Sequence, residues 1–395
     1  MDTIKDGIRF LLDNSMFLIM GTVAALFFAN IDPHYYHNLL DHEIAPHVNF
    51  HFIINDVFMC FFFALAAKEI WEALLPGGAL SSPKKAATPL LATAGGVIGP
   101  ALLFIGGVIT FDAPELSRGW AIPCATDIAF SYLVARLVFG KGHPAIPFLL
   151  LLAIADDAAG LIILAVFYPT GEMHLVLFLV SVGGAILFNI FILKKWLKVS
   201  NFWMYLVIAG PLSWYGFFMG GIHPALALVP IIPTLPHAHS DIGFFEAMED
   251  DTKKDPLNRF EHWWKNPVEL ILMLFGFANA GVAFSAMGLA TGLITFGLII
   301  GKPVGIVLLT LIAVKLFKLE MPTGMNYRDL TVLGIMAGIG FTVALFVATV
   351  AFPPGDILDS AKMGALFSFF ASLLAFAVAF MLKVGRYADK RVKKA

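Results

Sequence analysis

The chain has 395 residues, of which 59% are hydrophobic and only 14% are charged. An ordinary soluble domain carries roughly 25% charged residues, because a compact globule needs a wet, charged surface. The composition therefore excludes a soluble enzyme and indicates a polytopic membrane protein. The formal net charge of −2 is informative only when the charges are assigned to individual loops.

Apolar runs in chain order predict twelve membrane-spanning helices. A helix needs roughly 20 apolar residues to cross the bilayer, and lipid requires each long run to satisfy its backbone hydrogen bonds as a helix. The runs cover residues 15–32, 52–75, 88–109, 120–139, 146–168, 174–194, 202–219, 221–235, 268–288, 290–315, 329–351 and 361–385. We therefore expect an all-α integral membrane protein with one domain over residues 1–395. Its spanning region would be 15–385, followed by a basic cytoplasmic tail at 386–395.

The basic residues predict the orientation. Twelve crossings put both termini on one side, and 22 of the 26 Lys and Arg residues fall on that side. Because cytoplasmic loops are enriched in basic residues, both termini should be cytoplasmic. The outer loop 33–51 and the inner loop 236–267 are most simply solvated connectors, although the outer loop could instead form a β-structured contact between protomers.

Four charged residues lie within apolar runs at similar depth. Asp156 and Asp157 stand in the middle of IPFLLLLLAIADDAAGLIILAVFYP, Asp127 lies early in the fourth run, and Lys302 lies at the centre of the tenth. A charge at mid-membrane costs roughly 2.5–3.5 kcal/mol on insertion scales, so such residues usually serve function. A lone Asp–Lys pair could simply join two helices, but three acids and one base leave surplus negative charge that needs a cation or protons.

The adjacent aspartates cannot share one proton face to face, because neighbouring residues on a helix point about 100° apart. We expect one of them to face a cation in a central cavity and the other to pair with Lys302. Carboxylate oxygens suit hard cations such as Na⁺, Li⁺ and H⁺. Na⁺ and protons that compete for the same oxygens would be exchanged directly, and no cofactor is expected.

Two of the runs carry predicted backbone breaks. Pro123 precedes Ala125–Thr126–Asp127 in the fourth run, and proline disfavours a continuous helix. The eleventh run has Gly334, Gly338 and Gly340 around its midpoint. Interrupted segments at corresponding positions of two halves are typical of inverted-repeat transporters, although the glycines could alternatively be close-packing residues. Half-helix ends need compensating charge, which the neighbouring charged residues would provide.

Five other polar side chains have simpler explanations. Lys68 and Glu69, near the inner end of the second run, could reach water or form a surface pair. His223 is most simply an interfacial histidine, and Asn279 a helix–helix hydrogen bond. Glu261, at the cytoplasmic entrance to the ninth run, could sense pH, although a solvated helix end is the simpler explanation.

Six short motifs resemble those of the NhaA-type sodium/proton antiporters. They occur in the family's order over about residues 15–385, and together they are highly specific. The motifs are INDVFM (54–59), ATDIAF (125–130), ADDAAG (155–160), FANAGV (277–282), GKPVGI (301–306) and GIGFT (338–342).

The resemblance implies twelve helices, with helices 3–5 related to helices 10–12 by inverted topology. Helices 4 and 11 would be unwound where they cross. Asp157 would be the principal Na⁺ ligand, with Asp156 its neighbour and the partner of Lys302. Asp127 would balance the charge of the helix breaks, and Thr126 would add an oxygen.

The resemblance also implies the transport reaction, its physiological role and the oligomeric state. The family exports one Na⁺ or Li⁺ for two protons across the bacterial inner membrane, electrogenically, and so supports pH homeostasis and salt tolerance. It forms homodimers through an outer β-hairpin, here residues 43–53, and has no nucleic-acid partner. Of the family's cluster of pH-sensing residues only Glu69 aligns plainly, with Glu261 opposite it, so the pH dependence does not carry over.

Three other functions compete with antiport. An ion channel should show a continuous polar pore or a selectivity ring, and the sequence shows neither. The adjacency of Asp156 and Asp157 disfavours an intramembrane aspartyl protease. A cation-coupled solute symporter stays open, because a fold does not fix function; it would need a larger cavity and an organic solute.

Overall fold

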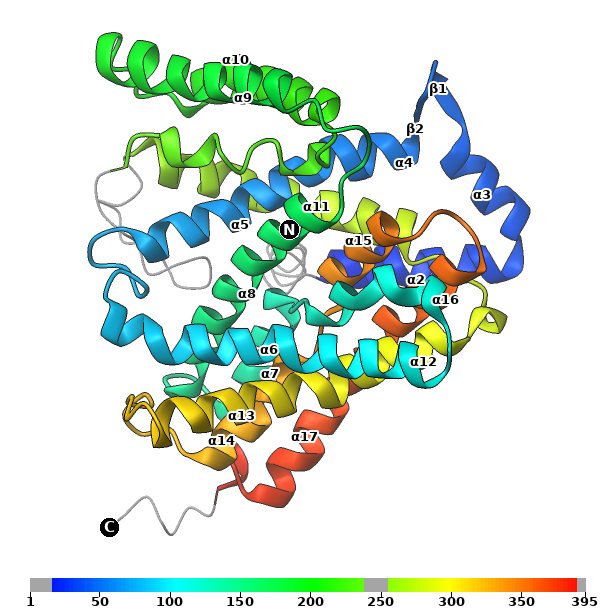
Figure 1. The fold of residues 1–395 in the computed structure, drawn as a ribbon, viewed down its shortest axis with the longest axis vertical. Coiled ribbons are helices and arrows are strands. Elements are labelled where there is room, and N and C mark those ends of the chain that lie inside the picture. Colours follow the sequence, from blue (N-terminus) through cyan, green and yellow to red (C-terminus); the bar gives the residue numbers. More distant parts are fainter. Residues whose placement is uncertain (1–15, 238–254, 389–395) are drawn as a thin grey trace, which may run out of the picture. The chain divides into compact units, whose positions relative to one another are not determined.

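Helices make up almost all of the structure, a computed structural model that describes residues 16–237 and 255–388 (Figure 1). The chain divides into two compact units, and each unit combines two separate stretches of sequence. The stretches are 1–81 with 161–281 in unit 1, and 82–160 with 282–395 in unit 2.

Seven helical segments within the described residues are long and apolar enough to cross a membrane, and two bent helix pairs raise the number to nine. The first predicted run forms a shorter helix, α2 (Met16–Ile31), and the runs at 221–235 and 268–288 fold differently from the prediction. The seven segments are Phe50–Leu74, Ala86–Thr110, Ala145–Phe167, Leu175–Trp196, Phe202–Gly220, Leu289–Lys315 and Asp356–Tyr387. The all-helical membrane class predicted from composition is confirmed.

Unit 1 contains two pairs of neighbouring helices. Helix α2 packs along α11 (Pro256–Asn279), and α9 (Leu175–Leu187) packs along α10 (Phe202–Gly220), as Figure 1 shows for the second pair. The second run and the end of α9 include wider π-helical turns, which often mark functional positions. The π-helical elements are η1 (Ile53–Phe58), which lies between α4 (Phe50–Phe52) and α5 (Met59–Leu74), and η3 (Phe188–Trp196), which follows α9.

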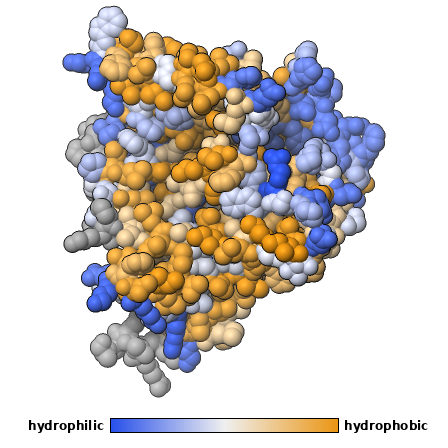
Figure 2. Space-filling model, viewed as in Figure 1, coloured by the Kyte–Doolittle hydropathy of each residue, from blue (hydrophilic) through white to orange (hydrophobic). Residues whose placement is uncertain are grey.

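A helix and a small hairpin connect the first two runs. Helix α3 (Pro33–Asp41) is followed by strands β1 (Glu43–Ala45) and β2 (Val48–Asn49), which pair antiparallel. Because residues 50–53 are helical, the hairpin is shorter than the predicted 43–53. Figure 2 shows hydrophilic side chains gathered over α3 and the hairpin, while hydrophobic side chains cover most of the remaining surface in that view.

The run at 221–235 does not form a regular helix, contrary to the prediction. It consists of turns that include the short 3₁₀ elements η4 (Pro224–Leu226) and η5 (Ile232–Thr234). Prolines at positions 224, 230 and 233 remove N–H donors and interfere with an α-helix. Most of the segment is buried, which explains why hydropathy alone made it look like a membrane span.

The ninth predicted run is also shifted. Helix α11 begins at Pro256 rather than near residue 268, because Asp255 accepts a hydrogen bond from the Asn258 N–H (2.9 Å) and proline favours a first helical turn. It ends at Asn279, and only the short 3₁₀ turn η7 (Phe284–Ala286) follows. The predicted inner loop is therefore helical from Pro256, and its residues 238–254 lie outside the described part of the chain.

In unit 2, α6 (Pro83–Thr110) packs closely against α13 (Lys302–Lys315), and the two helices run side by side in Figure 1. Two glycine pairs with the G-x-x-x-G spacing that lets helix backbones approach lie at this contact. They are Gly95 and Gly99 on α6, and Gly301, the last residue of η8 (Gly297–Gly301), with Gly305 on α13. A Cβ atom on Gly305 would lie 2.0 Å from the Gly95 carbonyl oxygen. Only glycine fits at this crossing.

The other elements of unit 2 continue the predicted runs. The twelfth run is interrupted by a turn at residues 368–369 and forms two helices rather than one. The elements are η2 (Pro114–Cys124), α7 (Ile128–Phe139), α8 (Ala145–Phe167), α12 (Leu289–Phe296), η8 (Gly297–Gly301), α14 (Tyr327–Ala337), α15 (Phe341–Ala351), α16 (Asp356–Phe367), α17 (Phe370–Leu382) and η9 (Gly385–Tyr387).

Candidate functional site

Two membrane segments of unit 2 are broken at the predicted positions. The 3₁₀ element η2 and helix α7 bend by 51° around residues 125–127, and helices α14 and α15 bend by 46° around residues 338–340. Pro123 lies just before the first break, and glycines occupy positions 338 and 340 of the second. The prediction of interrupted helices in the fourth and eleventh runs is confirmed.

The two breaks touch each other. The Asp127 N–H donates to the Ile339 carbonyl (2.7 Å), and the Thr126 hydroxyl lies 3.0 Å from the Ala337 carbonyl oxygen. A Cβ atom on Gly340 would lie 3.0 Å from the Ala125 carbonyl oxygen, so glycine keeps this approach open. Backbone groups released by one broken helix are thereby hydrogen-bonded by the other, as the interior of a membrane requires.

Asp127 joins the beginnings of two half-helices. Its Oδ1 accepts a hydrogen bond from the Phe130 N–H (3.2 Å) at the start of α7. Its Oδ2 accepts from the Thr342 N–H (3.2 Å) and from the Thr342 hydroxyl at the start of α15. The side chain is buried. A carboxylate at this place stabilises the positive ends of both helix dipoles.

Lys302 supplies the single positive charge of the site and is completely buried. It stands where the π-helical η8 passes into α13, directly before Pro303, whose missing N–H favours an irregular turn. Its ammonium donates to Asp156 Oδ2 (2.5 Å), the ion pair that the sequence led us to expect. It also donates to the carbonyl of Cys124 at the end of η2, where a cation stabilises the negative end of the helix dipole.

Asp156 is buried and only partly satisfied. Its Oδ2 receives both the Lys302 ammonium and the Thr126 hydroxyl, which lies 2.7 Å away. Its Oδ1 is buried and has no hydrogen-bond partner among the described residues. A buried carboxylate oxygen without a partner is costly and is therefore available to a proton or a cation.

Asp157 differs from its neighbour. It is half-buried, and within the described part of the chain no hydrogen bond or ion pair to its carboxylate is found. It lies within electrostatic range of Asp156, Asp127 and Lys302. The site thus combines three carboxylates with one ammonium, which leaves surplus negative charge around Asp157.

A second buried cluster lies in unit 1, where the sequence led us to expect exposed side chains. Lys68 is completely buried instead of reaching water, and Glu261 is buried instead of forming a solvated helix end. The Lys68 ammonium lies 2.8 Å from Glu72, 3.6 Å from Glu69, and in contact with Glu261. Glu72 had not been singled out, although its i,i+4 spacing from Lys68 is a typical ion-pair signal.

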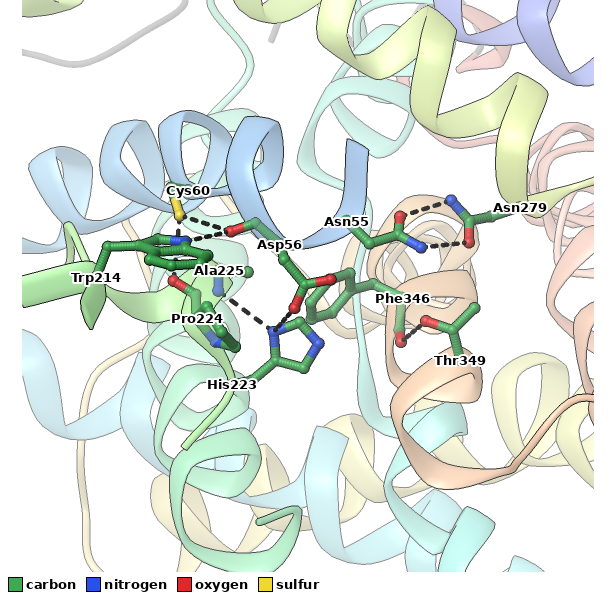
Figure 3. A network of polar contacts seen from close by, with 10 residues as sticks. All are labelled: Asn55, Asp56, Cys60, Trp214, His223, Pro224, Ala225, Asn279, Phe346 and Thr349. Atoms are coloured by element: carbon green, nitrogen blue, oxygen red, sulfur yellow. Dashed lines mark hydrogen bonds and ion pairs between the residues drawn. The ribbon is translucent and has the colours of Figure 1, made fainter. Parts of the chain in front are cut away.

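A polar network in unit 1 is drawn in Figure 3. Asn55 and Asn279 exchange two amide hydrogen bonds (3.1 and 2.8 Å), which confirms the helix–helix contact predicted for Asn279. The Asp56 carbonyl in η1 accepts from the Trp214 indole N–H (2.8 Å). The ring nitrogen of His223 lies 3.9 Å from the Asp56 carboxylate, and His223 is buried within the protein.

No three His, Cys, Asp or Glu side chains in residues 16–237 and 255–388 are grouped so that they could hold a resident metal ion. What unit 2 offers is carboxylate and hydroxyl oxygen from Asp156, Asp157 and Thr126. These hard donors suit a monovalent alkali cation or protons, and the single ammonium leaves charge for either.

Comparisons with known proteins agree with this chemistry. The family model described as Na⁺/H⁺ antiporter 1 matches residues 10–382. The chain is 50% identical over 417 residues to the Na(+)/H(+) antiporter NhaA of Jannaschia sp. (strain CCS1), covering 95% of this chain and 98% of that protein. It is 46% identical over 392 residues to the protein of the same name from Desulfitobacterium hafniense (strain DSM 10664 / DCB-2), covering 98% and 99%.

A solved structure is similar as well. It is the sodium proton antiporter MjNhaP1 from Methanocaldococcus jannaschii, with a TM-score of 0.57 over 95% of this chain and 92% of that one. At 14% sequence identity, this likeness concerns the fold alone.

Proposed function

The chain belongs to the Na⁺/H⁺ antiporter 1 family, and from that premise we propose that it exports Na⁺ or Li⁺ in exchange for protons at Asp156 and Asp157. Members of this family are transporters rather than enzymes. The transported ions are its substrates, and the proposed mechanism needs no resident cofactor.

The half-buried Asp157, whose carboxylate forms no hydrogen bond or ion pair with a described residue, carries the proposal. Asp156 is held by Lys302 and Thr126, whereas no described residue forms a hydrogen bond or ion pair with the Asp157 carboxylate. A carboxylate at membrane depth is costly unless a cation or a proton neutralises it. Asp157 would therefore be the principal cation ligand, with Asp156 and the Thr126 oxygen beside it.

Exchange would follow from competition for the same oxygens. When Na⁺ occupies the site, protons leave Asp157 and the Lys302-paired Asp156; when protons return, Na⁺ leaves. With the two broken helices opening the site alternately to either side, this competition produces antiport. The exchange would be electrogenic, because two carboxylates can take up more positive charge as protons than one Na⁺ brings.

The test is transport by the purified protein in proteoliposomes with a pH-sensitive dye inside and no organic solute present. Added Na⁺ should dissipate a preset pH gradient, and Asp157→Asn should abolish this response. Asp112→Asn, the same change at an exposed loop residue, is the matched control and should transport normally. Wild-type activity that appears only with an organic solute would indicate a symporter, and an active Asp157→Asn protein would reject the site.

The scaffold would be twelve membrane segments, of which 221–235 is a buried chain of turns, with inverted repeats of helices 3–5 and 10–12. Unit 2 consists largely of these runs. In each half a helical run with a G-x-x-x-G pair (α6, or η8 with α13) precedes a broken segment and then one further run, which supports the repeat. We treat the 395 residues as one domain of the bacterial inner membrane with both termini in the cytoplasm.

The protein would form a homodimer through the hairpin, whose ordered strands lie within residues 43–49. Strand β1 is exposed, and the outer edge of a strand offers backbone groups that a second copy could pair with. Removal of residues 44–48 should leave a monomer in detergent by light scattering. A dimer of unchanged stability would reject this interface.

A further inference from the structure

We propose that Leu298, in the π-helical turn η8, is a positioning residue that transmits movement of the two helix breaks to Lys302. The inference rests on the proposed function, because it assigns a task in the transport cycle to a residue outside the cation site. Leu298 lies in a long apolar run, so nothing in the sequence distinguishes it from its neighbours.

Leu298 is packed against the break between α14 and α15, and it is completely buried. A Cβ atom on Gly340 would lie 2.7 Å from Leu298 Cδ2, and a Cβ atom on Gly338 would collide with the Leu298 carbonyl oxygen. At both positions only glycine leaves room for this leucine. Because close-packed interiors transmit strain, a shift of α15 at the break would displace Leu298.

The same turn also contacts the break between η2 and α7. A Cβ atom on Gly297 would lie 2.7 Å from Cβ of Pro123, the residue that precedes this break. The Gly297 carbonyl in turn accepts a hydrogen bond from the Lys302 N–H, five residues further on, which is the pattern of a π-helix. A single turn of the chain therefore connects both breaks with the backbone of the lysine.

Helix α6 supports this turn. A Cβ atom on Gly301 would lie 2.8 Å from Pro100 Cα on α6, and a Cβ atom on Gly334 of α14 would lie 3.2 Å from Pro303 Cα. Residues 297–303 are thus in close contact with α6 and with both broken segments, which leaves little room for a displacement at the breaks to be absorbed. Rare π-helical turns frequently occur at functional sites, in keeping with a segment that rearranges during transport.

The aliphatic side chain of Leu298 offers no ligand to Na⁺, so its loss should slow transport without weakening ion binding. Leu298→Ala would leave a cavity between η8 and α15, into which the break could move without displacing the turn. In proteoliposomes, the maximal rate of Na⁺-driven proton exchange should fall about tenfold, which corresponds to about 1.4 kcal/mol in the barrier. The Kd for Na⁺, measured by calorimetry on the purified protein, should stay at the wild-type value.

Two further variants separate positioning from general packing. Leu298→Met conserves most of the volume and should restore most of the exchange rate. Leu293→Ala removes the same atoms from another buried leucine of the same run, one that faces Gly107 on α6. It should lower the melting temperature because it also leaves a cavity, yet it should exchange at nearly the wild-type rate.

A Leu298→Ala protein that exchanges at the wild-type rate would overturn the inference. So would a parallel loss of exchange rate and Na⁺ affinity, or an equal loss of rate in the Leu293→Ala protein, because either result would indicate a purely structural role. If the alanine variant does not fold, Leu298→Val leaves a smaller cavity and should show the same separation of rate from affinity. A wild-type protein that shows no Na⁺-driven proton exchange would refute the proposed function itself, which is a separate outcome.

Discussion

At the scale of single residues, Lys302 offsets part of the negative charge that is buried in unit 2. Its charge is fully buried and is met by Asp156 and by the Cys124 carbonyl. Removing one member of a buried ion pair costs about 3–5 kcal/mol, while replacing both members is often neutral. Lys302→Met should therefore lower the melting temperature strongly.

A double variant separates pairing from packing. Asp156→Asn with Lys302→Met should recover most of the stability that Lys302→Met loses, as measured by thermal unfolding in detergent. Lys315→Met, at the exposed end of the same helix, should melt as wild type. If Lys302→Met leaves the melting temperature unchanged, the two residues do not stabilise each other.

The cost of removing a buried cation can also be tested at Lys68 in unit 1. It faces three glutamates, Glu69, Glu72 and Glu261, so Lys68→Met would remove the buried ammonium that these carboxylates share. Protonation can neutralise stranded carboxylates in acid. The loss of melting temperature should therefore be larger at about pH 9 than at about pH 6. An equal loss at both values would mean that the lysine acts through its methylene packing alone.

At the scale of elements, the glycine crossing of α6 and α13 positions Lys302. Gly301 directly precedes the lysine, and Gly96 on α6 faces its side chain, since a Cβ there would lie 3.6 Å from Lys302 Cε. Gly305→Ala would drive a methyl group into the Gly95 carbonyl and force the helices apart. It should cost about 1–3 kcal/mol in stability and slow Na⁺-driven proton exchange.

Gly292 offers a control for this substitution. It lies in α12, and a Cβ there would meet nothing within 4 Å, so Gly292→Ala should preserve transport and raise helix stability slightly. If Gly305→Ala transports at the wild-type rate, close approach of α6 and α13 is not needed to place the lysine.

The sequence predicted those elements whose local chemistry is distinctive. Proline before residues 125–127 and glycines at 338 and 340 indicated both breaks, and charges within apolar runs indicated the site. Hydropathy could not distinguish a buried chain of turns from a span at 221–235, because both bury apolar side chains. Hydropathy also suggested that Lys68 lies near water. It could not reveal the buried ion pairs of Lys68, because one of its three acidic partners, Glu261, is distant in sequence.

At the scale of the whole molecule, the exposed apolar side chains indicate contact with lipid. Helices α9 and α10 expose Val176 (77%) and Val207 (63%) among many others, and hydrophobic residues dominate much of the surface in Figure 2. Patches of this extent on a protein surface mark a partner or a membrane. The orientation within that membrane is then set by where the basic loops lie.

Site-directed labelling tests the orientation. Cys60 and Cys124 are both free and buried, so a host variant with alanine at both positions allows single cysteines to be introduced at exposed sites. In intact cells, a membrane-impermeant maleimide should label His42→Cys, which lies between α3 and β1, because this loop carries no Lys or Arg. Lys315→Cys, at the end of α13, should react only after the membrane is opened. The reverse pattern would place the termini outside, and labelling of both sites in intact cells would show that the crossings between them are miscounted.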